Sequence, residues 1–277
     1  MDNTVLYNGG YRVLNGYVPF SDYWLVTGPL LDYINAFFFK ILGVSWRTFI
    51  IHSSIINLFF SLASYYLFTQ LGLSNKFSIL YAALIAVLFY PVVGTPFVDH
   101  HSTFFLVLAF YSFILGVKKK NYLYFSITPF FFCLSFLSKQ TPAVYGLFTI
   151  IPLILLYCYF NKKKIKKILS FFIYGSVSAI IFLVLFFIIT NININNFYEQ
   201  YLLFAGTIGD YRFSNYSFNL IDTFVRYKFI YIYLLILLVL LSKLLLNKKK
   251  NKENIFIILI SIILTMVLIF HQFYTLN

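Results

Sequence analysis

The amino-acid sequence predicts an all-α, polytopic membrane protein with about eight transmembrane helices. Three observations lead to this prediction: an apolar composition, a series of apolar stretches near bilayer length, and positive charge gathered in alternate loops. Of the 277 residues, 61% are hydrophobic and 10% are charged, against roughly 45–50% apolar and about 25% charged in typical soluble proteins. So few charges cannot cover a soluble surface, and the composition therefore excludes a soluble enzyme.

A helix crosses the roughly 30 Å hydrocarbon core in about 20 residues. Eight stretches come close to this length and are predicted to span the membrane: 46–71, 76–93, 102–117, 122–138, 142–160, 168–190, 229–246 and 255–271. The second and third are separated by Pro91, Gly94, Pro96 and the trio Asp99-His100-His101. The fourth and fifth are separated at Lys139, and Pro142 disfavours helical geometry just before it. Both breaks are therefore predicted to be tight turns between antiparallel spans.

The loops between these spans divide into two sets of very different charge. One set holds fourteen lysines and a single acid, Glu253, and so accounts for the whole formal charge of +13. The other set holds seven basic and seven acidic residues. Because an excess of Lys and Arg marks cytoplasmic loops, the lysine-rich set is predicted to be cytoplasmic. In this interpretation the basic charge is a topology signal, and no nucleic-acid partner is expected.

This orientation puts residues 1–45 and 191–228 outside the cytoplasm. We expect residues 1–45 to form a first outer loop with interfacial helices, because the run 30–42 is too short and too charged to span. Residues 46–277 are predicted to form the transmembrane domain. In the long outer loop 191–228, the stretch Phe197–Phe204 is also predicted to be an interfacial helix. Since residues 1–45 contain neither a signal peptide nor a span, we expect a further span upstream of Met1 and regard the chain as a fragment.

Candidate functional residues lie on the predicted outer face, because the cytoplasmic loops are short and filled with lysine. Asp99, His100 and His101 occur at a membrane boundary, where ionisable groups are costly unless they face water or one another. They are consistent with a polar cap on the following span, with proton transfer, or with a divalent metal site. Lys139 is consistent with snorkelling to the interface or with stabilising charge on a phosphate. His52 and His271 are isolated in spans and are predicted to pack or bond locally.

The first 45 residues contain a series of short motifs that, taken in order, are informative. They are Asp2-Asn3-Thr4-Val5-Leu6-Tyr7, Arg12-Val13-Leu14-Asn15-Gly16, Pro19-Phe20, Asp22-Tyr23, Gly28-Pro29-Leu30-Leu31-Asp32-Tyr33 and Phe39-Lys40-Ile41-Leu42-Gly43. Together with Asp99 and the turn Leu137-Ser138-Lys139-Gln140-Thr141-Pro142, this set resembles GT-C membrane glycosyltransferases, in particular relatives of the protein O-mannosyltransferases and the lipid A aminoarabinose transferase. The resemblance covers roughly the first 160 residues. Asn3 departs from it, because the family has Glu there.

The resemblance implies a fold with spans around a cavity that opens to the outer leaflet, in a bacterial inner membrane with a periplasmic active face. It also implies transfer of a sugar from a polyisoprenyl-phosphate donor to a lipid, glycan or protein acceptor, with inversion at the anomeric carbon. Asp2 would be the general base. Asp99, with His100 or His101, would orient the acceptor or a metal. Lys139, with Arg12 or Arg212, would stabilise the departing lipid phosphate, and Asp22 would support the loop.

Two other classes of function remain open at this level. A transporter or flippase would carry ionisable residues or Gly/Pro-interrupted sites near mid-span, often in internal repeats. The sequence contains no such repeat and no acid deep within a predicted span. A purely structural anchor would not need the first outer loop or the Asp99 segment. The glycosyltransferase is therefore the predicted function. No nucleotide-binding glycine loop occurs, so no nucleotide cofactor is expected, and the need for a metal stays open.

Overall fold

The computed structural model describes residues 2–89, 94–214, 220–246 and 252–275. These residues are almost wholly helical, which confirms the predicted fold class. The helices are α1 (Asp2–Leu14), α2 (Leu30–Leu42), α3 (Trp46–Leu71), α4 (Asn75–Phe89), α5 (Val98–Lys119), α6 (Leu123–Ser138), α7 (Gln140–Phe160), η1 (Lys162–Lys164), α8 (Ile165–Thr190), α9 (Ile194–Phe197), η2 (Tyr198–Leu203), α10 (Phe204–Ser214), α11 (Leu220–Leu246) and α12 (Lys252–Thr275).

The eight predicted spans correspond to α3–α8, α11 and α12. Within the described residues, five helices are long and apolar enough to cross a bilayer, and α4, α6 and α12 contain shorter apolar segments of 10–17 residues. One boundary was wrong: α5 begins at Val98, so Asp99, His100 and His101 lie in its first turn and not in the preceding turn. The first turn of a helix has unpaired N–H groups and a positive dipole end, which suits an acidic residue.

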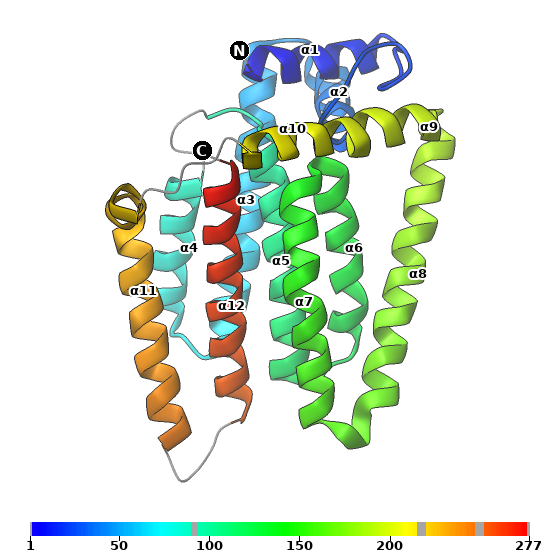
Figure 1. Cartoon of the computed structure of the whole chain (residues 1–277). Helices are drawn as coiled ribbons and strands as arrows, with labels where there is room; N and C mark the ends of the chain where they lie inside the picture. Colours follow the sequence, from blue (N-terminus) through cyan, green and yellow to red (C-terminus); the bar gives the residue numbers. More distant parts are fainter. Residues whose placement is uncertain (1, 90–93, 215–219, 247–251, 276–277) are drawn as a thin grey trace. The chain divides into compact units, whose positions relative to one another are not determined.

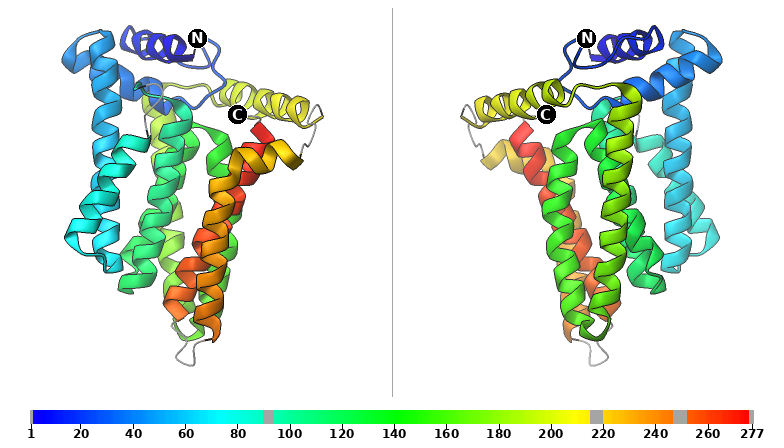
Figure 2. Two further views of the ribbon diagram at one scale, coloured as in Figure 1. Left: turned by 90° about the vertical axis from the view of Figure 1, so that its left-hand side faces the viewer. Right: turned by 90° about the vertical axis from the view of Figure 1, so that its right-hand side faces the viewer.

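The chain divides into two compact units, residues 1–144 with 166–205 and residues 145–165 with 206–277. In the second unit α11 and α12 are packed together. The α7 and α12 helices meet through Tyr157 and Phe256, whose ring centroids are 5.3 Å apart. In the first unit, α3–α6 and α8 carry α1 and α2 at one end (Figures 1 and 2). Residues 1–45 therefore belong to the same unit as the spans that follow them, so the predicted boundary at residue 45 is not the boundary between these units.

The first-loop helices predicted from the sequence are present, and α2 covers the predicted residues 30–42. Helix α1 approaches α2 closely at two glycines. A Cβ on Gly9 would lie 2.4 Å from Asp32 Oδ1, and a Cβ on Gly10 would lie 2.4 Å from the Asn35 Cβ. Any larger residue at these positions would push the two helices apart.

One buried apolar cluster joins the first loop to the spans. Leu6 of α1 packs with residues of α2 and α3 and with Val98, the first residue of α5. The full cluster consists of Leu6, Leu31, Phe39, Phe49 and Val98. Burial of such side chains contributes about 1.5–3 kcal/mol each. The cluster therefore fixes α1 beside the start of α5.

A second cluster joins the first loop to the segment that follows α8. Phe20 and Leu25 pack against Phe197 and Tyr201. Gln200 completes the junction, since its Oε1 accepts from Leu25 N at 3.0 Å and its Nε2 donates to Phe20 O at 2.8 Å. Residues 197–204, which were predicted to be helical, lie in a helical run through α9, the π-helical η2 and α10.

The opposite end of the first unit carries the lysine-rich loops. Lys119 Nζ donates to Tyr66 OH at 2.6 Å, and Tyr66 OH lies 2.9 Å from Tyr124 OH. Lys167 Nζ lies 4.6 Å from the centre of the Tyr122 ring. These contacts bring together the C-terminal end of α3, the α5–α6 turn and the start of α8. Within this unit, the two sets of loops predicted from charge are thus at opposite ends.

Candidate active site

An ion pair joins the start of α5 to the end of α6. Lys139 Nζ donates to Asp99 Oδ1 at 2.5 Å. The two side chains remain partly accessible, at 24% for Lys139 and 31% for Asp99. Asp99 and Lys139, which the sequence analysis considered separately, therefore lie together at one accessible point of the first unit.

The backbone around Lys139 is held rigidly. Lys139 is the single extended residue between α6 and α7, so Pro142 falls in the first turn of α7, where a missing N–H costs nothing. Ser102 Oγ donates to Lys139 O at 3.0 Å. Gly28 N donates to Ser138 O at 3.0 Å, and a Cβ on Gly28 would lie only 1.9 Å from Leu137 O. The first loop is therefore seated directly on the segment that carries Lys139.

A chain of buried polar groups runs from α1 to α5. Asn35 Nδ2 donates to Leu6 O at 3.3 Å, and Asn35 Oδ1 lies 2.6 Å from His52 Nδ1. His52 Nε2 lies 3.2 Å from His101 Nε2, and His101 Nδ1 lies 3.1 Å from Phe97 O. His52, expected from the sequence to pack or bond locally, contacts residues of two other helices, Asn35 of α2 and His101 of α5. His271 is outside the side chains that the structure describes.

The two adjacent histidines of α5 point in different directions, as neighbours on a helix must. His101 is 1% exposed and faces His52, whereas His100 is half-buried, with its ring centroid 5.8 Å from that of Phe97. Among the described residues no group of three or more His, Cys, Asp and Glu side chains has a geometry that could hold a metal ion. A divalent metal at Asp99 thus stays a prediction from the sequence.

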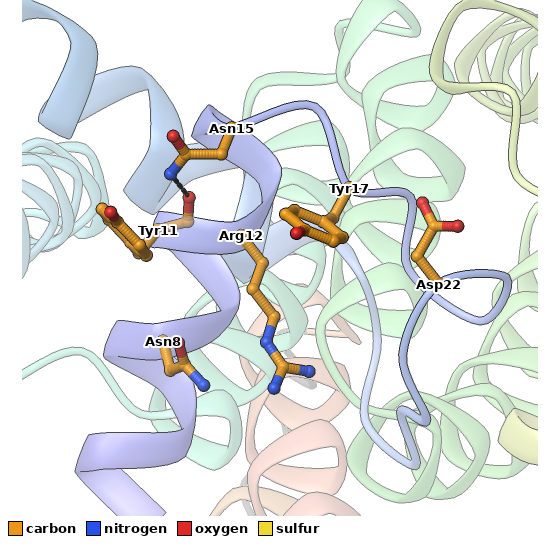
Figure 3. Close-up of a pocket in the computed structure, with 6 residues that line it drawn as sticks. All are labelled: Asn8, Tyr11, Arg12, Asn15, Tyr17 and Asp22. Atoms are coloured by element: carbon orange, nitrogen blue, oxygen red, sulfur yellow. Dashed lines mark hydrogen bonds between the residues drawn. The ribbon is translucent and has the colours of Figure 1, made fainter.

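Arg12 and Asp22, two further candidate site residues of the first loop, lie in a separate place. They line a cavity of about 580 Å³ together with Asn8, Tyr11, Asn15 and Tyr17 (Figure 3). We call these six residues the α1 basin. The Arg12 guanidinium carbon lies 5.1 Å from the centre of the Tyr23 ring. Asp22 Oδ2 accepts from Val18 N at 2.6 Å, so its carboxylate bonds to the backbone of its own loop.

A buried carboxyl lies behind the basin. Tyr23 OH donates to Asp32 Oδ2 at 2.7 Å, and Asp32 is 2% exposed. Burial raises the pKa of Asp32 to about 7, against the lowering effects of the Tyr23 hydrogen bond and of Arg12. Burial and the nearby Asp32 raise the pKa of Tyr23.

Asp2, the predicted general base, is the first residue of α1, and its side chain lies outside the described part of the structure. The side chain of Arg212 is likewise not described. Asp2 precedes Leu6 by four residues, which is about one turn of α1. Leu6 in turn packs with Val98, the residue before Asp99. The start of α1 and the start of α5 are therefore neighbours.

Comparison with known families gives the decisive observation. A profile of the dolichyl-phosphate-mannose-protein mannosyltransferase family matches residues 26–189, which is more than half of the chain. The chain belongs to this family. It is accordingly a membrane glycosyltransferase of the GT-C type, which uses a sugar linked to a polyprenyl phosphate. No curated protein and no solved structure matches the chain significantly.

The matched range contains Asp99, Lys139, Asn35, His52 and His101 but begins after Arg12 and Asp22. Sequence reasoning missed Asn35 and the partner of His52. One signal was available for Asn35, since it lies midway between Leu31 and Phe39 at helical spacing, and both of these are buried. No local pattern pairs His52 with His101, because they are 49 residues apart.

Proposed function

We propose that the chain transfers a sugar from a polyprenyl-phosphate donor to a hydroxyl group of an acceptor, at the membrane end formed by the first loop and the starts of α5 and α7. The observation that supports this most directly is the Asp99–Lys139 pair, at 2.5 Å, within the region that matches the glycosyltransferase family. Such a reaction needs a group that receives a proton and a cation that meets the leaving phosphate. Acidic and basic side chains at one accessible point are suited to both needs.

In the proposed reaction the acceptor oxygen attacks the anomeric carbon while the bond from that carbon to the phosphate oxygen breaks. The hydroxyl proton passes to Asp2, and the electron pair leaves with the polyprenyl phosphate. A carboxylate is a suitable base, because the acceptor hydroxyl becomes acidic only as the new bond forms. Attack from the side opposite the phosphate inverts the anomeric carbon.

Lys139 is proposed to stabilise the negative charge of the departing phosphate. Lys139 is paired with Asp99, so in the proposed reaction the donor phosphate displaces this carboxylate from Lys139. Asp99 then becomes free to accept a hydrogen bond from the acceptor. His100, beside Asp99 on α5, is proposed to contact substrate, while His101 supports the site from the buried side.

The reaction is proposed to occur on the periplasmic face of a bacterial inner membrane. The distribution of lysine residues supports this assignment, since the end of the first unit with the Asp99–Lys139 pair lies opposite the lysine-rich loops. Positively charged loops remain in the cytoplasm.

The test is a turnover assay on the full-length gene product in lipid nanodiscs. The protein is incubated with polyprenyl-phosphate-linked mannose or glucose and a membrane extract from cells that lack it, and release of polyprenyl phosphate is measured. We expect Asp2→Asn, Asp99→Asn and Lys139→Met each to lower turnover by about a hundredfold or more.

The controls Glu199→Gln and Lys40→Met remove exposed charges from the same end of the first unit and should leave turnover unchanged. Full turnover in both the Asp2 and the Asp99 variants would refute the assignment of the catalytic acids. Transport of the intact donor lipid without release of polyprenyl phosphate would instead favour a flippase.

A further inference from the structure

The exposed face of α1 has a composition unlike that of the rest of the helix. One side of α1, continued just beyond its end, consists of four polar residues: Asn8, Tyr11, Arg12 and Asn15. Their spacings of three, one and three residues place them on the same side of a helix. All four are exposed. The opposite side consists of Leu6, Gly9 and Gly10, which are buried against α2 and its neighbours. The polar side is thus not needed to pack α1.

The chain then turns back and faces this side. Asn15 Nδ2 donates to Tyr11 O at 2.7 Å, and Gly16 has φ of +86°, a left-handed conformation that favours glycine. The turn brings Tyr17 and Asp22 opposite α1, as Figure 3 shows. The hydrogen bond from Val18 N to Asp22 Oδ2 closes the loop. The conformation of the backbone therefore brings the six residues of the α1 basin together.

The chemistry of the basin matches a neutral, polyhydroxylated ligand. Tyr11 and Tyr17 are 46% and 54% exposed, so each offers a ring face together with a hydroxyl group. Rigid tyrosines supply contact area at a low cost in conformational entropy. Asn8 and Asn15 supply both donors and acceptors, and the charges of Arg12 and Asp22 cancel. The volume of about 580 Å³ lies within the range of small-molecule sites.

An anionic ligand fits this basin less well. Phosphate sites commonly use bidentate guanidinium groups or several donors directed at one point. Here the only basic side chain lining the basin is Arg12, which is already stacked near Tyr23, and Asp22 would repel an anion. An apolar ligand would leave the amides and the charged groups of the basin without hydrogen-bond partners.

We propose that the α1 basin is a carbohydrate subsite that binds sugar units of a glycan acceptor. This inference rests on the proposed glycosyl transfer for its biological meaning, but the binding of sugar does not depend on it. Asn8 and Arg12, which both line the basin, follow Asp2 by six and ten residues, or about 9 and 15 Å along a helix at 1.5 Å per residue. The basin thus extends away from Asp2, and in the proposal it binds a unit further along an acceptor of several sugars, next to the reacting one.

Binding is tested first without catalysis. The full chain in nanodiscs is titrated with mannotriose, a neutral probe, and with inorganic phosphate, and binding is followed by saturation-transfer NMR and calorimetry. We expect mannotriose to bind and Tyr11→Ala and Tyr17→Ala to weaken it by about tenfold each, since exposed rings are removed without loss of core packing. Tyr11→Phe and Tyr17→Phe keep the ring and should stay within about threefold of the wild type.

The matched control is Tyr198→Ala, which removes a tyrosine of similar exposure, 51%, from outside the basin and should leave binding unchanged. Equal binding by the two basin alanine variants and the wild type would overturn the proposal. The proposal would also be overturned if the basin bound phosphate, if Arg12→Gln abolished that binding, and if mannotriose did not displace the phosphate.

Kinetics then separate the acceptor from the donor, which also carries a sugar. With an oligosaccharide acceptor, Tyr11→Ala and Tyr17→Ala should raise the KM for the acceptor and leave the KM for the donor unchanged. A raised KM for the donor alone would overturn the assignment to the acceptor. If Asp99→Asn abolishes turnover while both tyrosine variants behave as wild type, only the subsite fails. If mannotriose binds as expected and no donor is consumed, only the proposed reaction fails.

Discussion

His52 of α3 and His101 of α5 meet with their Nε2 atoms 3.2 Å apart, and both side chains are almost fully buried, at 0% and 1% exposure. Asn35 extends this contact to the backbone of α1 at Leu6. The four helices α1, α2, α3 and α5 are thus tied by one polar chain. Two of them, α1 and α5, carry the acids Asp2 and Asp99 that we propose for catalysis.

Replacing either histidine with alanine is expected to destabilise the protein by about 1–3 kcal/mol, because a buried polar group is left without its partner. The double variant should cost less than the sum of the single variants, with a coupling energy of about 0.5–3 kcal/mol. Apparent melting temperatures of the purified single and double variants measure this. Strict additivity would mean that the two imidazoles do not stabilise one another.

The spans and the first-loop helices could be predicted from the sequence because their signals are local. Apolar length predicted α3 and α8, and the short run 30–42 predicted a separate helix before the first span, which is α2. The His52–His101 contact could not be predicted, since it depends on how α3 and α5 are placed by the packing of Phe49 and Val98 against Leu6. The same holds for the Asp99–Lys139 pair, whose members were recognised singly but not as partners.

Asp99 and Lys139 are expected to matter far more for activity than for stability. Their pair is partly exposed, so Asp99→Asn and Lys139→Met should each change stability by less than about 1 kcal/mol. Turnover should fall by about a hundredfold or more. Thermal melting and polyprenyl phosphate release, measured on the same samples, compare the two effects. The double variant Asp99→Lys with Lys139→Asp exchanges the two charges and can restore the ion pair. Recovered turnover in this variant would argue that Asp99 and Lys139 have a structural role only.

Gly28→Ala is expected to detach the first loop from the end of α6, because the new Cβ would lie 1.9 Å from Leu137 O, a backbone atom that cannot move aside. The cost should be about 1–3 kcal/mol or more. Hydrogen exchange should accelerate at Leu25 N–H, which Gln200 protects. Gly206→Ala is the control, since a Cβ there meets no atom within 4 Å. Unchanged protection of Leu25 in the Gly28 variant would contradict the observed docking.

The buried carboxyl of Asp32 predicts that stability falls as pH rises. Its pKa is raised by burial from 3.8 to about 7 in the folded chain. Between these values the folded chain binds a proton that the unfolded chain has lost, so this stabilising contribution is complete below about pH 4 and is lost as pH rises through 7. A shift of three units corresponds to an upper value on the order of 4 kcal/mol.

Asp32→Asn tests this, because an amide oxygen can still accept from Tyr23 OH but carries no charge at any pH. We expect the apparent melting temperature of the wild type to fall between pH 5 and pH 8 and that of the variant to change much less. The variant should be the more stable of the two at pH 8. Parallel curves for the two proteins would show that Asp32 does not titrate in this range.

The separation of the two sets of loops predicts which residues a membrane-impermeant reagent reaches from outside the cell. Ser21 is exposed in the first loop, and Lys76 is exposed at the start of α4, at the lysine-rich end of the same unit. In a variant with Cys133 and Cys158 replaced by alanine, a cysteine at position 21 should react with an impermeant maleimide in intact cells. A cysteine at position 76 should react only after the membrane is permeabilised, because lysine-rich loops stay in the cytoplasm. The reverse pattern would place the Asp99–Lys139 pair on the cytoplasmic side, and the donor lipid would then have to present its sugar there.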